Sequence, residues 1–583
     1  MSTRRFASSV RRYASNLVLL FLACCLPPTL HAQDEWAAEA RATASCREMV
    51  ARPTDRAATI LIFPDSAVTA YCEFGTAPGA YTRSTSEVQC PAGTPQSFLL
   101  EGLDAGTRYF YRLRFRPAGA AQFDAAAERS FRTAARRGMP FAFAVEADPH
   151  LDANTKPELY RRTLSNILAG GNDFLIDLGD TFMSEKLTTV TPDSVRLRHE
   201  YLRGFFDQTC HSVPLYLVIG NHEGELGWLL DGRETSVPVL TARQRTALFA
   251  NPVADDFYAG NMVSEPFVGL RQNYYAWEWG DALIIVLDPY WYTPVKPGKN
   301  VDNWSWTLGR TQYDWLVAQL RNSTARYRFV FSHQLVGGAS EGRGGAESSV
   351  YYEWGGKNAD GSEGFTAKRP GWDAPIHDLL VRYGVQVFFH GHDHFFARQQ
   401  RDGVVYQLVP QPGNPNYRTA VNAAEWTYVT GDILPCSGYV RVSIGDTNAR
   451  IDYVRSYLPA DENGSRRNGD ISFSYTVPPR IPGTGVDAAA APDVPLLDLP
   501  SPHPLRGPAT FRYRLSTAGT YQLTLRDVLG RQVATLAEGA AAEGWHDVVW
   551  SPGRAGIRMP AGAYIAVLET GRHVQHRTIL IGE

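Results

Sequence analysis

Three features that mark other classes of protein are missing from this 583-residue sequence. No apolar run is long enough to cross a bilayer as a helix, which needs about 20 residues. No block of Lys and Arg stands out and the net charge is −3, so the basic surface that binds nucleic acid is lacking. No two cysteines have the C-x-x-C spacing of redox or zinc-thiolate sites. We therefore expect neither a transmembrane segment nor a nucleic-acid partner.

The first 32 residues have the pattern of a secretory signal peptide. Four arginines precede the short apolar run LVLLFLACCL, and a small residue, Ala32, stands before the expected cleavage at Gln33. Arg4-Arg5 could instead signal twin-arginine export, and Phe21–Cys24 loosely resembles a lipoprotein cleavage box. Each alternative predicts export, so we expect a secreted or cell-surface protein.

Cysteine is scarce beyond this leader. The five cysteines after residue 32 are Cys46, Cys72, Cys90, Cys210 and Cys436. Export permits disulfides, and an odd count leaves at least one thiol unpaired. Cys72 and Cys90 lie within one expected small β domain, so we predict a disulfide between them.

Five apolar runs each end on residues that can bind metal. The runs are FAFAVEADPH, DFLIDLGD, PLYLVIGNH, YRFVFSH and VQVFFHGHDH. Short runs rich in Val, Ile, Leu and Phe predict buried strands, and open α/β sheets bind ligands at the carboxyl ends of their strands. The candidate ligands at these ends are Asp148, His150, Asp180, Asn221, His333, His392 and His394.

These residue types indicate a particular class of metal centre. Carboxylate and amide oxygens mixed with imidazoles suit Zn, Mn or Fe rather than a thiolate site. Seven ligands are too many for one tetrahedral ion, but they suffice for two ions that share a bridging carboxylate. Two ions roughly 3.5–4 Å apart can clamp the attacking and leaving oxygens of an in-line displacement. The pattern predicts a preassembled dinuclear site.

The ordered motifs carry a family resemblance. D-x-H at Asp148, G-D at Gly179, G-N-H-E at Gly220–Glu223, the strand-end His333 and G-H-x-H at Gly391–His394 resemble the calcineurin-like metallophosphoesterases. NYYAWEWGDALIIVLD resembles the paired strands of that family, and LGRTQYDWLVAQL resembles the helix after them. The resemblance implies an α/β fold: a four-layer sandwich of two mixed sheets with helices outside, over residues 138–476.

The resemblance also implies roles for the site residues. One ion would be bound by Asp148, His150, Asp180 and His394. The other would be bound by Asp180, Asn221, His333 and His392, with Asp180 as the bridge. His222 would be the general acid or transition-state stabiliser, and Glu223 would orient it. His390 has no place in the family's ligand set, so we expect it to pack beside the ligands.

The sequence departs from one branch of that family. Purple acid phosphatases carry a metal-binding Tyr three residues after the bridging Asp, where this chain has Met183, and they lack the His found here as His150. We therefore expect no charge-transfer colour. Their substrate histidines are also missing from the Gly-rich segment after His333. Arg343 in that segment could contact phosphate, but we expect a solvated side chain.

Two β domains are expected to flank the catalytic domain. Residues 33–51 are expected as a linker, and residues 52–134 alternate apolar and polar side chains, as a β-sandwich does. The segment Leu100–Phe115 resembles fibronectin type III domains, with Leu103 in the core and Tyr109 at the corner. Such a domain would act as a scaffold or pocket wall, with carbohydrate binding as the alternative.

The C-terminal part begins with a Pro-, Gly- and Ala-rich segment, residues 477–500, that predicts a linker. Residues 501–583 resume strand patterning. Their motifs around Asp527–Arg531, Gly544–His546 and Ala561–Tyr564 resemble sorting domains of the type IX secretion system, whose machinery would then be a partner. An ordinary immunoglobulin-like appendage is the alternative.

Three functions remain open on the sequence alone. Phosphomonoester hydrolysis by a metal-bound hydroxide leads, because an open dinuclear site on an exported protein suits phosphate scavenging. Phosphodiester or nucleotide hydrolysis is the alternative, although the missing basic surface argues against polymers. A non-catalytic metal-binding surface protein is the third, and His222 argues against it. The phosphate-ester substrate stays unidentified because residues 224–272 and 337–372 match no motif.

Overall fold

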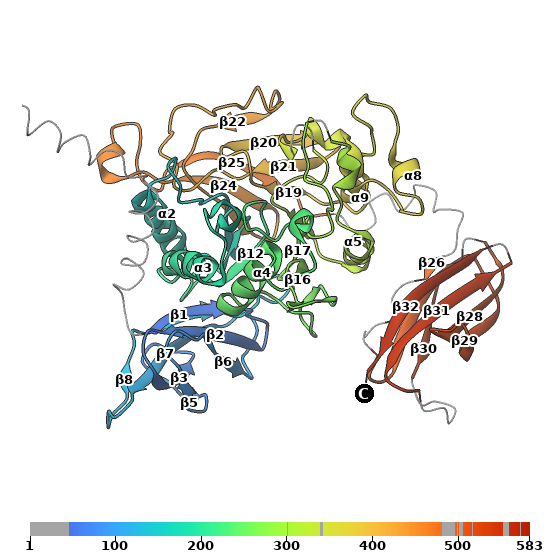
Figure 1. The fold of residues 1–583 in the computed structure, drawn as a ribbon, viewed down its shortest axis with the longest axis horizontal. Coiled ribbons are helices and arrows are strands. Elements are labelled where there is room, and N and C mark those ends of the chain that lie inside the picture. The colour runs from blue at the N-terminus through green and yellow to red at the C-terminus, as the bar shows by residue number, and fades with distance from the viewer. Residues whose placement is uncertain are drawn as a thin grey trace, which may run out of the picture. The chain divides into compact units, whose positions relative to one another are not determined.

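The computed structural model describes residues 46–299, 301–338, 342–480, 496–497, 500, 505–515, 517–551, 559–571 and 573–582. The chain forms two compact units, divided between Ile481 and Pro482 (Figure 1). The expected signal peptide and most of the expected linker between the two units lie outside the described residues. No helix in these ranges is long and apolar enough to cross a membrane.

The first unit begins with a small domain of two antiparallel sheets. One sheet has the order β1-β2-β6, and the other has the order β4-β3-β7-β8, with β5 paired to β3 and β9 to β7. The strands are Cys46–Ala51 (β1), Ala57–Pro64 (β2), Val68–Gly75 (β3), Arg83–Ser84 (β4), Val88–Cys90 (β5), Gln96–Glu101 (β6), Arg108–Pro117 (β7), Asp124–Ala125 (β8) and Arg129–Arg132 (β9). Alternate residues of β3, β6 and β7 are buried, as the period-two pattern predicts.

This domain starts earlier than the sequence predicted. Residues 46–51, expected as linker, form β1, and every one of them is buried. The strand pairs with β2, from Cys46 opposite Pro64 to Ala51 opposite Thr59. Charged residues at positions 47 and 48 break the apolar pattern of the strand although both are buried, which is why the pattern did not predict it.

The predicted disulfide is wrong, because Cys72 and Cys90 are both free and buried. The strand register gives the reason. Cys90 on β5 lies opposite Val68 of β3, four residues before Cys72. At about 3.3 Å per residue along a strand, that offset separates the two Cα atoms by more than the ~7 Å that a disulfide can bridge.

The central domain is built on two mixed sheets. The first has six strands in the order β12-β11-β10-β23-β24-β25. Strands β10, β11 and β12 are parallel, whereas β23, β24 and β25 continue the sheet antiparallel. The strands are Phe141–Glu146 (β10), Phe174–Asp177 (β11), Leu215–Leu217 (β12), Gly438–Ile444 (β23), Ala449–Arg455 (β24) and Ile471–Val477 (β25).

The second sheet has eight strands in the order β13-β16-β17-β18-β19-β21-β20-β22. Its middle strands β17, β18, β19 and β21 are parallel. The strands are Ala259–Gly260 (β13), Tyr275–Trp279 (β16), Ala282–Val286 (β17), Tyr327–Phe331 (β18), Val387–His390 (β19), Phe396–Arg401 (β20), Val404–Leu408 (β21) and Asp432–Leu434 (β22). The expected paired strands of the NYYAWEWGDALIIVLD segment are β16 and β17, with Tyr275 opposite Val286.

Helices cover the outer faces of both sheets, so the domain has the four layers expected (Figure 1). Between the sheets, the rings of Phe143 and Phe174 stack at 4.8 Å and belong to one core with Phe329. The helices α2 and α3 pack on the first sheet, and α5 and α9 pack on the second. The helices are Pro157–Ala169 (α2), Pro192–Phe206 (α3), Val237–Leu248 (α4), Arg310–Asn322 (α5), Tyr352–Gly355 (α7), Phe365–Lys368 (α8) and Ile376–Arg382 (α9).

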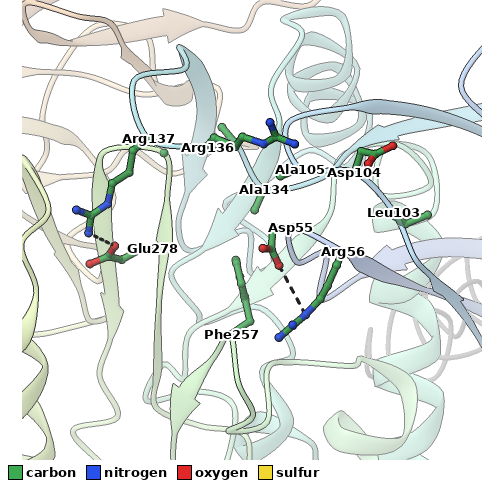
Figure 2. A pocket seen from close by; sticks show the side chains of 12 residues that line it. Asp55, Arg56, Leu103, Asp104, Ala105, Ala134, Arg136, Arg137, Phe257 and Glu278 are labelled. Atoms are coloured by element: carbon green, nitrogen blue, oxygen red, sulfur yellow. Dashed lines mark hydrogen bonds and ion pairs between the residues drawn. The ribbon is translucent and has the colours of Figure 1, made fainter.

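The N-terminal domain docks on this sandwich through buried contacts. The Val50 N–H of β1 donates to the Cys210 carbonyl at 2.8 Å, and the Tyr111 hydroxyl donates to the His211 carbonyl at 2.8 Å. A cavity of about 460 Å³ lies at the same junction (Figure 2). Two ion pairs line it, Arg137 with Glu278 at 2.8 Å and Arg56 with Asp55 at 3.9 Å. Such exposed pairs are worth about 0–1 kcal/mol, so the buried contacts hold the two domains together.

The second unit is a β-sandwich, as expected for the C-terminal segment. Its sheets have the orders β26-β27-β30 and β29-β28-β31-β32, and Phe511, Leu525 and Leu568 belong to its core. Its first strand precedes the expected boundary at residue 501. The strands are Leu496–Leu497 (β26), Ala509–Leu515 (β27), Gly519–Asp527 (β28), Gln532–Ala541 (β29), Gly544–Trp550 (β30), Gly562–Thr570 (β31) and Val574–Ile581 (β32).

Candidate metal centre

The predicted ligands follow the carboxyl ends of strands from both sheets of the central domain. Strands β10, β11 and β12 belong to the first sheet and β18 and β19 to the second, and the loop after each one carries candidate ligands. The backbone of these loops is unusual. Five candidate ligands have positive φ: Asp148 (59°), His150 (51°), Asp180 (55°), His392 (77°) and His394 (66°). Such conformations are costly for residues other than Gly and gather at functional sites.

The structure brings six of the seven candidates into two groups of three: Asp148, His150 and His394, and Asp180, His333 and His392. In the first group, Asp148 Oδ1 lies 3.7 Å from His150 Nε2 and 3.6 Å from His394 Nε2. In the second, Asp180 Oδ2 lies 3.1 Å from His333 Nε2. The same oxygen is 3.6 Å from His150 Nε2, so Asp180 faces both groups, which is the position a bridging ligand needs.

Each carboxylate of the site has one oxygen held and one free. The His392 N–H donates to Asp148 Oδ2 at 2.8 Å, and the His222 N–H donates to Asp180 Oδ1 at 2.7 Å. The second oxygen of each carboxylate has no hydrogen-bond partner within the described part of the chain. The same holds for three further buried atoms of candidate ligands, so the unpaired atoms are Asp148 Oδ1, Asp180 Oδ2, His150 Nε2, Asn221 Oδ1 and His392 Nε2. A buried unpaired polar atom costs about 1–3 kcal/mol. Metal coordination would satisfy all five, so the donor set fits a metal centre.

Neighbouring acceptors orient two of the imidazoles. His333 Nδ1 lies 2.9 Å from the Leu178 carbonyl oxygen, and His150 Nδ1 lies 3.2 Å from Asp152 Oδ2. Outer partners of this kind fix the tautomer and leave Nε2 to face the metal. Sequence reasoning missed Asp152, although its place two residues after His150 was a usable signal.

The electrostatics of the site also favour a cation. Burial disfavours a charged imidazole, yet the carboxylates of Asp148, Asp152 and Asp180 raise the pKa of His150 well above its usual range. Burial also lowers the pKa of His333, but nearby carboxylates, chiefly Asp180, raise it to about 9. The buried carboxylates thus stabilise a positive charge in the site, and a bound metal ion would supply that charge.

His222 lies at the rim of this site, and its orienting partner differs from the prediction. Its Nε2 is 3.9 Å from Asp180 Oδ2, and its side chain is 18 % exposed. Its Nδ1 pairs with the carboxylate of Glu185, in the 3₁₀ turn Ser184–Lys186. Glu185 belongs to no motif, and it lies 37 residues from His222 in the sequence, so only the fold identifies it.

Glu223 has a different role from the predicted one. Its carboxylate accepts hydrogen bonds from the backbone N–H groups of Asp180 (3.0 Å), Thr181 (2.6 Å) and Phe182 (3.2 Å), and from that of Gly220. Glu223 therefore ties the G-D loop to the G-N-H-E loop, and it does not orient His222. Asn221 and His222 lie in a turn and Glu223 in the bend that follows it, so adjacency in the sequence does not bring the side chains of His222 and Glu223 together.

Two glycines allow the loops to approach one another. A Cβ atom on Gly391 would lie 2.7 Å from Asp148 Oδ2, and one on Gly220 would collide with Asp180. The motif glycines are thus needed for close packing around the carboxylates. His390, as expected, packs rather than joining either group: its ring stacks on Phe388 with centroids 5.5 Å apart. Burial lowers the pKa of His390 to about 3.

A buried ion-pair network supports the loop after the G-N-H-E motif. Arg271 donates to Glu225 at 2.7 Å and to Asp288, two residues after β17, at 2.9 Å. Arg245 of α4 donates to the other oxygen of Glu225 at 2.5 Å. All four side chains are buried. The network fastens the 224–272 segment to the second sheet beside the site.

Comparisons with known proteins bear on the central domain. Residues 141–396 match the sequence model of the family described as calcineurin-like phosphoesterase. The chain resembles the structure of PhoD, with a TM-score of 0.53, 16 % identity, and 74 % of this chain and 89 % of that chain covered. It also resembles purple acid phosphatase PPD1 from yellow lupin (Lupinus luteus) seeds, with a TM-score of 0.48, 14 % identity and 74 % of each chain covered.

A search of curated proteins gave no match. The family match covers the segment that contains the loops of the candidate centre, from β10 to the start of β20. The PhoD likeness supports the same fold. Residues 141–396 therefore form a calcineurin-like metallophosphoesterase domain, which the chain carries between β-rich regions.

Proposed function

We propose that the protein is an exported phosphatase that hydrolyses phosphomonoesters at a dinuclear centre of Fe, Mn or Zn. The observation that carries the proposal is the convergence of two carboxylates and four imidazoles whose free, buried atoms face one another. A structural role for these residues would leave several buried polar atoms unpaired, which folded proteins avoid.

The protein's own residues divide the work of the reaction. Bound ions would neutralise the phosphoryl oxygens and lower the pKa of coordinated water. Asp148 and Asp180 hold the charge that retains two cations, and the backbone N–H groups of His392 and His222 keep those carboxylates in place. His333 and His150 face the centre with Nε2 because their Nδ1 atoms are occupied.

His222 is the group placed to act on the departing oxygen. It lies at the open edge of the site, and Glu185 holds its Nδ1 so that Nε2 faces the centre. A proton on Nε2 can then pass to the leaving oxygen as the ester bond breaks. General acid help of this kind typically contributes about 10²–10⁴-fold.

A substrate panel tests the proposal. The purified protein, loaded in turn with Mn, Zn or Fe, is assayed on nitrophenyl phosphate, methyl phosphate and bis(nitrophenyl) phosphate. We expect kcat/KM for nitrophenyl phosphate to exceed that for the diester by at least about tenfold, or roughly 1.4 kcal/mol of transition-state discrimination. A preference for the diester would instead identify a phosphodiesterase. Two bound ions without turnover on any ester would identify a non-catalytic metal-binding protein.

The flanking domains complete the proposal. Leu103 is buried and the Tyr109 hydroxyl accepts from the Asp104 N–H at 3.0 Å, which supports a fibronectin III-like scaffold with a tyrosine corner. We assign the N-terminal leader to export and the C-terminal sandwich to type IX sorting. In a host with that secretion system, the full chain should reach the cell surface or medium, and deletion of residues 501–583 should retain it inside.

A further inference from the structure

Arg343 lies beside the metal centre and is not the solvated loop residue that the sequence suggested. Its side chain is 26 % exposed. Its Nη1 donates to the His392 carbonyl at 3.0 Å and to Asp393 Oδ1 at 2.8 Å. The guanidinium carbon also lies 4.1 Å from the centre of the Trp426 ring. These contacts fix the charge of Arg343 next to the G-H-x-H motif.

Asp393 is the anchor of this arrangement. It stands between the ligands His392 and His394 and is only 2 % exposed. Its Oδ2 accepts from the Gly344 N–H at 2.9 Å and from the Tyr428 hydroxyl at 2.7 Å, which leaves Oδ1 for Arg343. Since a buried carboxylate needs such partners, the loop that carries Arg343 is held against the ligand loop.

The guanidinium keeps hydrogen-bonding capacity after these contacts are made. One nitrogen, Nη1, makes both hydrogen bonds of the guanidinium, and among the described residues Nε and Nη2 have no partner. A rigid, partly exposed guanidinium with free donors is suited to bind phosphoryl oxygens.

We propose that Arg343 binds the non-bridging oxygens of the substrate phosphate and thereby favours dianionic monoesters over monoanionic diesters. The inference deepens the proposed function, on which it rests, by assigning the recognition of the substrate's charge to one residue. Asp393 and Trp426 hold the guanidinium, so little side-chain entropy is lost when phosphate binds. A diester offers one negative charge where a dianion offers two, so it gains less from Arg343.

Two substitutions separate substrate binding from support of the loop. Arg343→Ala removes the charge and also leaves Asp393 without its partner. Arg343→Lys can keep the single contact with Asp393 Oδ1, because only Nη1 makes that contact now, but it lacks the Nε and Nη2 donors. Arg401→Ala is the matched control, since Arg401 is 25 % exposed and also pairs with an aspartate, Asp402, at the far end of β20.

The primary readout is the binding of inorganic phosphate to the metal-loaded protein by calorimetry. We expect Arg343→Lys to weaken phosphate binding about tenfold and Arg343→Ala about 10²-fold, with metal content unchanged in Arg343→Lys and in Arg401→Ala. In turnover, kcat/KM for nitrophenyl phosphate should fall at least about tenfold more than that for bis(nitrophenyl) phosphate. Arg401→Ala should match the wild type in every readout.

Failure of this inference is distinguishable from failure of the proposed function. If Arg343→Lys binds phosphate within about twofold of the wild type, the guanidinium only supports the loop and the inference is overturned. Equal losses on the monoester and diester would overturn its role in selectivity. If no ester is hydrolysed but phosphate binding still depends on Arg343, the proposed catalysis fails while the binding site stands.

Discussion

The roles of single side chains around His222 differ from those that the G-N-H-E motif predicts. Two glutamates lie near His222, and the one that is adjacent in sequence has a structural role. Glu223 accepts four backbone hydrogen bonds, whereas Glu185 pairs with the ring. A carboxylate can accept hydrogen bonds from several N–H groups at once, so Glu223 is suited to join two loops. The His222 ring instead pairs with Glu185, which lies in a different turn.

The shared carboxylate should dominate metal binding. Asp180→Asn removes the charge that faces both groups, so we expect metal content to fall from two ions to fewer than one per chain, measured by inductively coupled plasma mass spectrometry. His390→Ala is the comparison, because His390 is buried nearby but lies outside both groups, and we expect it to keep its metal. If His390→Ala empties a site while His392→Ala does not, the assignment of the last motif is wrong.

The role of His222 should depend on the leaving group. His222→Asn should lower the hydrolysis of methyl phosphate by about 10²–10⁴-fold, because an alkoxide needs a proton to depart. Nitrophenyl phosphate should be spared, since nitrophenolate leaves unaided. Glu185→Gln should show the same selectivity more weakly. Equal losses on both substrates would assign His222 to phosphate binding instead.

Glu223→Gln makes the same chemical change as Glu185→Gln, but we expect it to affect stability and metal binding. An amide has one acceptor oxygen where the carboxylate has two, so some of the four N–H groups would lose their partner. Each loss costs about 1–3 kcal/mol. We expect a lower Tm and reduced metal content, in contrast to Glu185→Gln, which should keep both. Intact metal binding in Glu223→Gln would show that the two loops do not depend on this junction.

Strand β1 places an ionisable side chain, that of Glu48, in a buried position. It is covered on both sides, and Glu48 within it is 7 % exposed. Burial raises the pKa of Glu48 to about 7 from its usual value near 4.5, although Arg129 and the hydroxyl of Tyr111 act in the opposite direction, and Asp207 adds to the rise. The folded chain therefore binds this proton more tightly than the unfolded chain does.

The sign of the resulting pH dependence follows directly. Because the folded pKa is the higher one, stability falls as the pH rises from about 4.5 to about 7, by at most roughly 3.5 kcal/mol at about 1.4 kcal/mol per pKa unit. Glu48→Gln removes this loss. We expect calorimetry to show that the variant gains stability over the wild type at pH 8 but not at pH 4.5, with exposed Glu87→Gln as the control for lost charge. The same difference at both pH values would contradict the assignment.

For the chain as a whole, the division into two units predicts where it can be shortened. Every candidate ligand, His222 and Arg343 lie in the unit that ends at Ile481. A chain ending at Ile481 should keep two metal ions and a kcat/KM within about twofold of the full chain, while losing its surface or extracellular destination. Loss of metal or of intrinsic turnover would show that the C-terminal sandwich helps to build the site.

Local patterns were sufficient to predict the buried strands and the candidate ligands, whereas the four layers were implied by the family resemblance. Apolar runs such as FAFAVE and FLID are buried on both faces of a sheet and therefore show in the sequence. Helix α2 has Pro157 at its start and buried residues at helical spacing, including Leu164 and Ile167. The candidate ligands could be picked out because each follows its strand within a few residues.

The tertiary structure alone decided which residues support those ligands. The sequence established the strands, the helices and the ordered Asp, Asn and His residues, because these depend on neighbours in the chain. It could not identify Glu185, the anchoring of Arg343 by Asp393, or the register that keeps Cys72 from Cys90. Those contacts join loops and strands distant in sequence, and they depend on distances that exist only after the two sheets have packed.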